Sequence, residues 1–301
     1  ALRYLAEGDP IYKGNADKDY TVINQDGYFD NRTLHMNYYA TKALQARVYM
    51  WEGSDQSLAI AQAAAQEVID DSGAKWVDPD ALSQTDPTKL DYTFTSEYLF
   101  GLYIFNLSEF VNDATSGDTQ SSNSLLLESR YVDDGMYKTV EYDQDNNPIP
   151  TEDVGDIRYA RLLVNASGVY YPVKLKQMSS NYSDFSKRVP IIRLPEMYFI
   201  KAECMAREGL NADALEVIDI VRKSRGLISS LDPGEYDAME VLTKEYMKEF
   251  IMEGQFMFFC KRLGIKEVKD SQDNVFVEFP DKLTLPPYPL SELTNNRVQD
   301  K

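Results

Sequence analysis

The stretch RLPEMYFIKAECMAREG, residues 193–209, decides the fold class of this chain. Pro195 fits the first turn of a helix, because its fixed φ suits that position and the N–H that it lacks has no helical partner there. Apolar residues then recur at three- and four-residue steps: Tyr198, Ala202 and Met205. Gly209 can end the helix in the left-handed conformation. The stretch therefore predicts a helix over residues 194–208.

A partner helix follows directly. Asn211 can cap it, and its apolar face contains Leu215, Ile218 and Val221. These signals predict a helix over residues 211–225. Because the connection between the two helices is short, we expect them to pack as an antiparallel hairpin.

An earlier pair of helices has the same construction. The face that the first helix, residues 34–52, is expected to bury contains Met36, Ala40, Ala43, Leu44, Val48 and Trp51. Gly53 can end this helix, and Ser54 or Asp55 can cap a second one over residues 55–71. In both hairpins an Ala-Arg pair is followed shortly by glycine and an alanine-rich helix, which resembles the units of a tetratricopeptide array.

A further long helix is predicted over residues 238–260. One side of it contains Met239, Leu242, Tyr246, Phe250, Gly254 and Phe258. The helical scaffold is thus expected mainly at residues 34–71 and 194–260.

The region between the two hairpins, about residues 73–190, lacks the helical spacing of apolar residues. YLFGLYIF (98–105) and GVYYPVKL (168–175) are typical of strands, whereas SGDTQSSNS (116–124) and YDQDNNP (142–148) are typical of loops or turns. The expected fold class is mainly α, with tetratricopeptide-like helix hairpins and an irregular middle region of loops and short strands.

The charge of the chain limits its partners. The 31 Lys and Arg residues face 49 Asp and Glu residues, which gives a formal net charge of −18. Such a chain repels the phosphate backbone, so nucleic acid is not an expected partner. No apolar run approaches the roughly 20 residues of a membrane span. The sequence opens at Ala1 without a signal peptide, and we expect the natural N-terminus to have been removed.

Residues that commonly bind metals or act as nucleophiles are scarce. The single histidine, His35, is expected on the surface at the start of a helix, and it leaves little basis for zinc or Ser-His-Asp chemistry. Cys204 and Cys260 both lie in apolar helical patterns, which favours buried small hydrophobes over a disulfide or a metal pair. No cofactor and no bound metal are expected.

Two patterns of acidic residues have a catalytic or metal-binding alternative. Glu245, Glu249 and Glu253 lie at four-residue spacing and could supply the general acid and nucleophile of a glycoside hydrolase. Because Lys244 and Lys248 interleave with them, a solvated, charged helix face is the preferred interpretation.

The segment DQDNNP, which starts at Asp143, begins like a calcium loop. It departs from that pattern at Pro148, where a glycine is required, and at Val154, where a glutamate is required. A hairpin turn is therefore expected here.

Four blocks of this sequence occur in the order seen in the SusD/RagB family of Bacteroidetes: RLPEMYFIKAECMAREG (193–209), VRKSRGL (221–227), EFIMEGQFMFFCKRLG (249–264) and LPPYPLSELTNN (285–296). NYYATKALQARVYMWEG (37–53), FTSEYLFGLYIF (94–105) and GDIRYARLL (155–163) resemble further family segments. The resemblance covers roughly residues 34–295.

This resemblance implies a lipoprotein on the surface of the outer membrane, which works beside a SusC-like TonB-dependent transporter and captures nutrients, mostly oligosaccharides. It implies one SusD-like domain over residues 1–301, lacking the family's N-terminal portion and its lipidated cysteine. Arg193, Glu196 and Glu203 are then framework residues that make ion pairs or hold neighbouring loops. The alternatives are a protein that binds a different nutrient, such as a peptide, a lid for the transporter, or a glycoside hydrolase.

The binding site is expected in the irregular middle, because a sugar needs flat aromatic rings for its C–H faces and polar groups for its hydroxyls. Two loops offer this mixture. The expected ligand-binding residues are Tyr131, Tyr137, Asn181, Tyr182, Asp184 and Phe185. The alternative for each aromatic residue is that it only pins its loop to the helices. Trp51 and Trp76 are expected to pack in the core or within the first hairpin.

Overall fold

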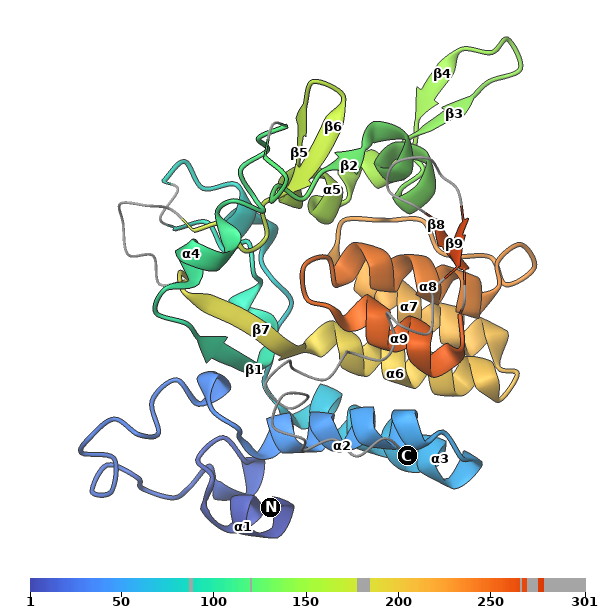
Figure 1. Cartoon of the computed structure of the whole chain (residues 1–301). Coiled ribbons are helices and arrows are strands. Elements are labelled where there is room, and N and C mark those ends of the chain that lie inside the picture. Colours follow the sequence, from blue (N-terminus) through green and yellow to red (C-terminus); the bar gives the residue numbers. More distant parts are fainter. Residues whose placement is uncertain (87–88, 120, 178–184, 266, 270–275, 279–301) are drawn as a thin grey trace, which may run out of the picture.

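A computed structural model describes residues 1–86, 89–119, 121–177, 185–265, 267–269 and 276–278 (Figure 1). Its α-helices are α1 (Leu2–Gly8), α2 (Tyr38–Glu52), α3 (Asp55–Asp71), α4 (Leu107–Val111), α5 (Ile157–Leu162), α6 (Leu194–Arg207), α7 (Asn211–Ser224), α8 (Ala238–Glu249) and α9 (Gln255–Leu263). Short 3-10 helices and one π-helical turn, η6 (Tyr131–Met136), lie between them. The mainly α fold class is confirmed.

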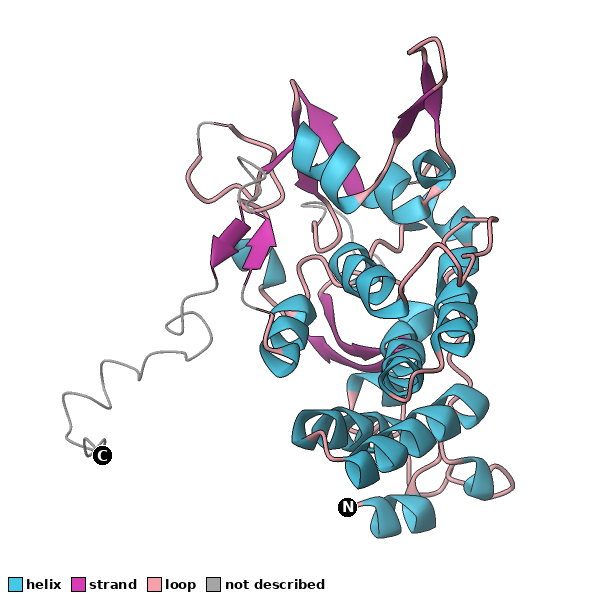
Figure 2. Ribbon diagram, turned by 90° about the vertical axis from the view of Figure 1, so that its right-hand side faces the viewer, coloured by secondary structure: helices cyan, strands magenta, loops and turns pink. Residues whose placement is uncertain are grey.

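The strands are short and form small separate sheets. They are β1 (Tyr98–Tyr103), β2 (Leu127–Glu128), β3 (Val140–Tyr142), β4 (Pro148–Pro150), β5 (Leu163–Ala166), β6 (Val169–Pro172), β7 (Arg188–Arg193), β8 (Glu267–Lys269) and β9 (Phe276–Glu278). In the described residues β1 pairs with β7, β3 with β4, β8 with β9, and β6 lies between β2 and β5, all antiparallel. The β3–β4 pair confirms the turn expected at residues 142–148. Figure 2 shows these strands at several places around the helices.

The first hairpin follows the expected caps. The Asn37 side chain accepts a hydrogen bond from the Ala40 N–H, so α2 begins at Tyr38 and not at Leu34 as predicted. Gly53 ends α2 with φ 76°, and the Ser54 side chain caps α3, which has the predicted bounds.

The buried face of α2 differs from the predicted one. Its fully buried residues include Tyr39, Ala43, Ala46 and Met50, which pack against alanines of α3. The predicted core residues Leu44, Val48 and Trp51 are instead exposed, by 36%, 57% and 51%. The small side chains allow α2 and α3 to approach closely, and this contact turns the larger apolar residues outward.

The central helix is α6, which joins the two halves of the scaffold. Met197, Ile200 and Cys204 belong to the core shared with α2 and α3, whereas Phe199 and Ala202 belong to the core shared with α7 and α8. Figure 1 shows α2 and α3 on one side of α6 and α7 to α9 on the other. The helices predicted at 194–208 and 211–225 are confirmed to within one residue.

The helix predicted over residues 238–260 is broken. α8 ends at Glu249 and α9 starts at Gln255, and between them Met252 and Gly254 have φ of 63° and 73°. The Glu249 carbonyl accepts hydrogen bonds from Lys174 Nζ (2.7 Å) and Arg193 Nη2 (2.9 Å), two side chains from outside the helix. These bonds satisfy a terminal carbonyl that a continuing helix would bond internally, so the chain can turn there.

Candidate ligand-binding surface

Tyr137, an expected ligand-binding residue, is buried. Only 2% of it is exposed, and it packs with Val132, Met136 and other residues of one hydrophobic cluster. The Lys248 ammonium lies 4.9 Å from the centre of its ring. Burial raises the pKa of the Tyr137 hydroxyl well above its usual value. The structure does not support Tyr137 as a stacking residue, because the protein already covers its ring, and its role in ligand binding stays a prediction.

Tyr131 packs against the same cluster and is partly buried. Beside it, Asp133 accepts hydrogen bonds from the Tyr159 and Tyr170 hydroxyls at 3.0 and 2.9 Å. These two hydroxyls also lie 2.7 Å apart. Asp133 thus ties η6 to α5 and β6. The tyrosines of this region pin the loop to the fold, as the alternative interpretation held.

The second expected loop is described only in part. Asn181, Tyr182 and Asp184 lie outside the described residues, and Phe185 is partly buried. Just after it, the Lys187 N–H donates to Gln177 Oε1 at 2.7 Å and the Lys187 carbonyl accepts from the Ile104 N–H at 2.8 Å. Phe185 therefore lies beside the end of β1, whereas Tyr131 and Tyr137 lie in the cluster at η6.

Exposed aromatic side chains lie at this end of β1. Tyr103, Phe105 and Phe110, named here the aromatic rim, are 54%, 74% and 68% exposed. The Lys187 ammonium lies 4.0 Å from the centre of the Phe105 ring, and Arg188 pairs with Tyr103 across β1 and β7. The rim thus places exposed aromatic rings near basic residues, and aromatic rings beside polar groups can bind a sugar.

The rim was not predicted, because YLFGLYIF was interpreted only as a strand and its aromatic residues were not assigned to the site. In the structure only the first part of β1 is buried, and Leu102 and Tyr103 are exposed. One signal was available in the sequence. Tyr103 and Phe105 are two residues apart, so in an extended segment they share one face just before the polar Asn106.

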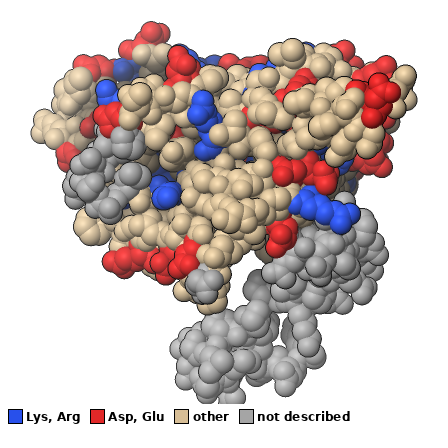
Figure 3. Space-filling model, turned by 90° about the horizontal axis from the view of Figure 1, so that it is seen from above, with Lys and Arg blue, Asp and Glu red and all other residues tan. Residues whose placement is uncertain are grey.

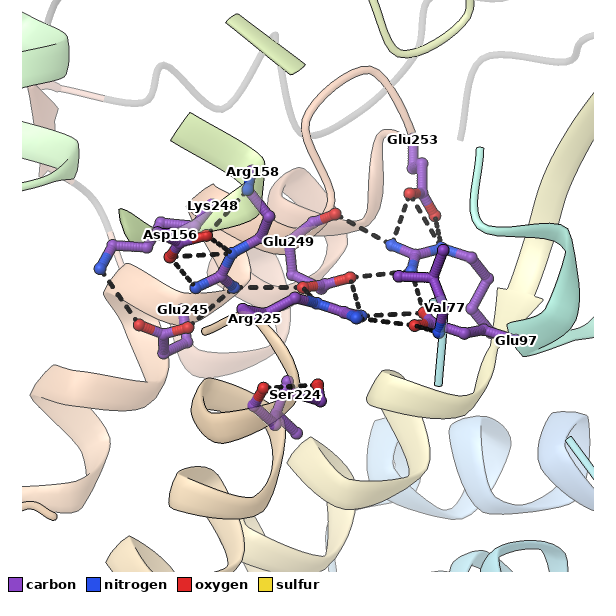
Figure 4. A network of polar contacts seen from close by, with 12 residues as sticks. Val77, Glu97, Asp156, Arg158, Ser224, Arg225, Glu245, Lys248, Glu249 and Glu253 are labelled. Carbon is purple, nitrogen blue, oxygen red and sulfur yellow. Dashed lines mark hydrogen bonds and ion pairs between the residues drawn. The ribbon is translucent and has the colours of Figure 1, made fainter. Parts of the chain in front are cut away.

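A buried ion network joins the helical scaffold to the irregular middle (Figure 4). Arg193, at the junction of β7 and α6, pairs with Glu97, Glu249 and Glu253. Arg225, after α7, pairs with Glu97 and Glu249. The framework role expected for Arg193 is confirmed.

The predicted acidic row, formed by Glu245 and Glu249 of α8 and by Glu253 just after it, belongs to this network. Glu245 and Glu249 are 2% and 1% exposed, and the side chain of Glu253 is 3% exposed. Their interpretation as a solvated helix face is therefore wrong. The reason is that guanidinium groups from distant segments neutralise them: Arg158 pairs with Glu245 at 2.9 Å and with Glu249 at 3.1 Å, and also with Asp156.

The network keeps the Glu245 and Glu249 carboxylates ionised. Burial alone would raise the pKa of Glu249, but Arg225, Arg193 and Arg158 outweigh it and hold that pKa well below its usual value. In the same way Arg158 and Lys248 lower the pKa of Glu245 to about 2 against the effect of burial. A carboxyl group that acts as a general acid needs a raised pKa, so that it is still protonated near neutral pH. The arrangement is that of a structural cluster.

The two tryptophans, Trp51 and Trp76, differ in how they pack. Trp76 packs 5.1 Å from the Tyr198 ring and lies beneath the Arg225 guanidinium, which confirms its packing role. Trp51 is half exposed, so its expected place in the core is wrong. Together with Val48 and Phe258 it lines an apolar groove of about 260 Å³ between α2 and α9.

The remaining candidate groups are the two cysteines and the single histidine. Cys204 and Cys260 are buried free thiols, as expected, and His35 is exposed just before α2. Within the described residues, His, Cys, Asp and Glu side chains form no group of three or more that could hold a metal ion. Of the helices described, none has both the length and the apolar character that crossing a bilayer requires.

Several solved structures share this fold. A sugar-binding protein from Bacteroides vulgatus, described as putative in its title, is 22% identical, with a TM-score of 0.58, over 86% of this chain and 57% of its own. NanU from B. fragilis is 17% identical, with a TM-score of 0.56, over 89% and 63% of the two chains. Surface glycan-binding protein A from Bacteroides thetaiotaomicron, in complex with laminarihexaose, is 17% identical, with a TM-score of 0.54, over 87% and 62%.

This chain thus spans about three fifths of the length of these relatives. No curated protein matches it significantly. The family model described as the SusD family matches residues 3–278, which is most of the chain and includes both helix hairpins, the aromatic rim and the ion network. The chain belongs to the SusD family.

Proposed function

We propose that this chain captures oligosaccharides at the surface of the outer membrane, without cleaving them, and delivers them to a SusC-like TonB-dependent transporter. The observation that carries the proposal is the aromatic rim on a SusD-family fold. Its three rings are exposed, Phe105 lies against the Lys187 ammonium, and Tyr103 is the cross-strand partner of Arg188. Sugars are bound by aromatic rings together with polar groups.

The similar structures support a carbohydrate ligand. One is described as a putative sugar-binding protein, and another holds laminarihexaose. The surface charge is compatible with this ligand class. Figure 3 shows, on the side that carries the β3–β4 and β5–β6 hairpins, broad uncharged areas between the acidic and basic side chains. A neutral oligosaccharide meets little electrostatic repulsion there despite the net charge of −18.

The ion network supports a role without hydrolysis. Hydrolysis of a glycosidic bond by paired carboxylates needs two groups that flank the bond, one of them protonated. Glu245 and Glu249 are instead enclosed by guanidinium groups that keep them ionised. The anchoring to the outer membrane and the single domain over residues 1–301 remain part of this proposal.

Isothermal titration of the chain with laminarihexaose and a panel of other α- and β-linked oligosaccharides tests the ligand class. Phe105→Ala should weaken binding of a glycan that the wild type binds by about fivefold to tenfold, because one stacking contact contributes on the order of 1 kcal/mol. The matched control is Phe258→Ala, which removes a phenylalanine ring that is 50% exposed from α9, away from β1.

Loss of binding in Phe258→Ala but not in Phe105→Ala would refute the rim as the site. Binding of peptides and of no glycan would refute the ligand class. Release of reducing sugar by the wild type would refute the absence of hydrolysis. Co-purification of a tagged full-length protein with a TonB-dependent transporter from outer membranes tests the proposed partner.

A further inference from the structure

A second pocket, separate from the aromatic rim, lies along α8. It has a volume of about 270 Å³, close to the lower end of the roughly 300–1,000 Å³ that small-molecule sites occupy. It is formed by α8, the loop that precedes α8, η7 (Glu152–Gly155) and residues near β3. No residue of the rim lines it. Its size suits one small ligand unit.

The floor of this pocket carries buried charges. Arg222, Glu245 and Lys248 are 7%, 2% and 6% exposed. Arg222 is fully engaged, because it donates to Asp219, Glu152 and the Ser229 carbonyl at 2.6, 2.9 and 3.0 Å. These bonds hold the guanidinium in place as part of the wall.

Lys248 differs from Arg222 in its hydrogen bonding. Its ammonium lies 3.2 Å from Glu245 and 3.6 Å from Asp153, and Figure 4 shows it reaching toward Glu245 at the edge of the ion network. Among the described residues, neither contact has the geometry of a hydrogen bond. An ammonium has three N–H donors, and a buried one is costly to leave without hydrogen bonds. Lys248 therefore retains donor capacity at the floor of the pocket.

The charges around the pocket disfavour an anionic ligand. Seven lining residues are acidic: Glu141, Glu152, Asp153, Glu235, Asp237, Glu240 and Glu245. Four are basic: Lys138, Arg222, Lys244 and Lys248. An anion would meet the seven lining carboxylates, and a cation that reached the floor would meet the two buried basic groups, Arg222 and Lys248. Hydroxyl groups both donate and accept hydrogen bonds, so a neutral polyhydroxyl ligand suits such a mixed lining.

The pocket also offers a ring face. Tyr236 lines it and is 45% exposed, and Leu231 and Val241 add apolar contacts. A pyranose ring has one face of C–H groups and an edge of hydroxyls, which matches a tyrosine ring opposite charged donors and acceptors.

We propose that this pocket is a second binding site, which holds one neutral sugar residue with Tyr236 against its C–H face and Lys248 donating to a hydroxyl. The site rests on the proposed function, because it assumes that the natural ligands are glycans. It adds a contact for a single residue at a place separate from the aromatic rim, so a branched or long glycan can engage the chain at two points.

The test uses ligand-observed NMR with methyl glycosides of glucose, galactose, mannose and N-acetylglucosamine at millimolar concentration, and with glucuronate and glucosamine as charged counterparts. At least one neutral glycoside should bind the wild type, and more tightly than both charged sugars. Tyr236→Ala should weaken it about fivefold to tenfold. The matched control is Tyr142→Ala, since Tyr142 is a 65% exposed tyrosine of the neighbouring strand β3 that does not line the pocket.

Lys248→Met probes the donor while keeping the aliphatic stem, and its folding is checked by circular dichroism. Tyr236→Ala keeps the test decisive if Lys248→Met does not fold. Equal binding by wild type and Tyr236→Ala, or tighter binding of a charged sugar than of every neutral glycoside, contradicts the proposed second site. If Phe105→Ala loses oligosaccharide binding while Tyr236→Ala retains all glycan binding, the second site fails and the proposed function stands. If no glycan binds the wild type at all, the proposed function fails and the second site fails with it.

Discussion

The substitution Glu249→Gln should be among the most destabilising single changes in this chain. The Glu249 carboxylate accepts four hydrogen bonds, at 2.8 Å from Arg193, 3.1 Å from Arg158, and twice 2.9 Å from Arg225. A glutamine keeps one acceptor oxygen and turns an NH2 donor toward guanidinium donors. It also removes the negative charge between three buried cations.

Breaking a buried ion pair by removing one partner costs about 3–5 kcal/mol, because the remaining charge stays desolvated. Glu97, Glu245 and Glu253 still compensate the arginines in part, so we expect a loss within this range and not the sum of four bonds. In a domain of this size such a loss lowers Tm by roughly 10 °C.

Thermal and urea unfolding at pH 7, followed by circular dichroism, measure the effect. The control is Glu216→Gln, which changes an exposed carboxylate on α7 and should alter the free energy of unfolding by less than about 0.5 kcal/mol. If Glu249→Gln shifts the unfolding midpoint no more than this control, the reasoning about the network is refuted. The folded fraction should keep wild-type glycan affinity, since Glu249 does not belong to the aromatic rim or line the second pocket.

Three further predictions follow from burial. Tyr137→Ala should lower the free energy of unfolding by about 3–5 kcal/mol in urea titrations and leave glycan affinity unchanged; lost affinity with unchanged stability would restore Tyr137 to the site. The pKa of Glu245 is lowered to about 2, so its stabilising contribution is present above the ordinary pKa of 4.5 and is lost as pH falls toward 2. Glu245→Gln should therefore flatten the acid limb of the stability curve, and an unchanged limb would contradict this. The pKa values of Cys204 and Cys260 are raised by burial to about 12, so a thiol reagent should label the chain only in denaturant; rapid labelling of the native protein would show that the thiols are accessible.

The helices could be predicted because their signals are local. The cap at Ser54 and the left-handed Gly53 act on residues within one turn, so the end of α2 and both bounds of α3 were predicted closely. The start of α2 was predicted four residues too early, because the cap at Asn37 was not recognised. The break between α8 and α9 could not be predicted. It depends on side chains of Lys174 and Arg193, which are 75 and 56 residues away from the carbonyl that they bind.

In the candidate site, too, local sequence signals predicted some features, whereas contacts between distant segments determined others. Composition and the order of the sequence blocks indicated a binding protein with aromatic loops. They could not tell Tyr137, which is covered by its cluster, from Phe105, which is open to solvent, because both are aromatic residues in an irregular region. Burial of such a residue is set by what packs on it, and those neighbours come from other segments.

The sequence by itself thus determined the fold class, the hairpins, the acidic balance and the family blocks, since these depend on residue type and short spacing. Only the tertiary structure decided that the predicted acidic row lies inside the protein. A glutamate can be buried when cations neutralise it. Here those cations come from Arg158, Arg193 and Arg225, which lie 91, 56 and 24 residues from Glu249 and meet only in the folded chain.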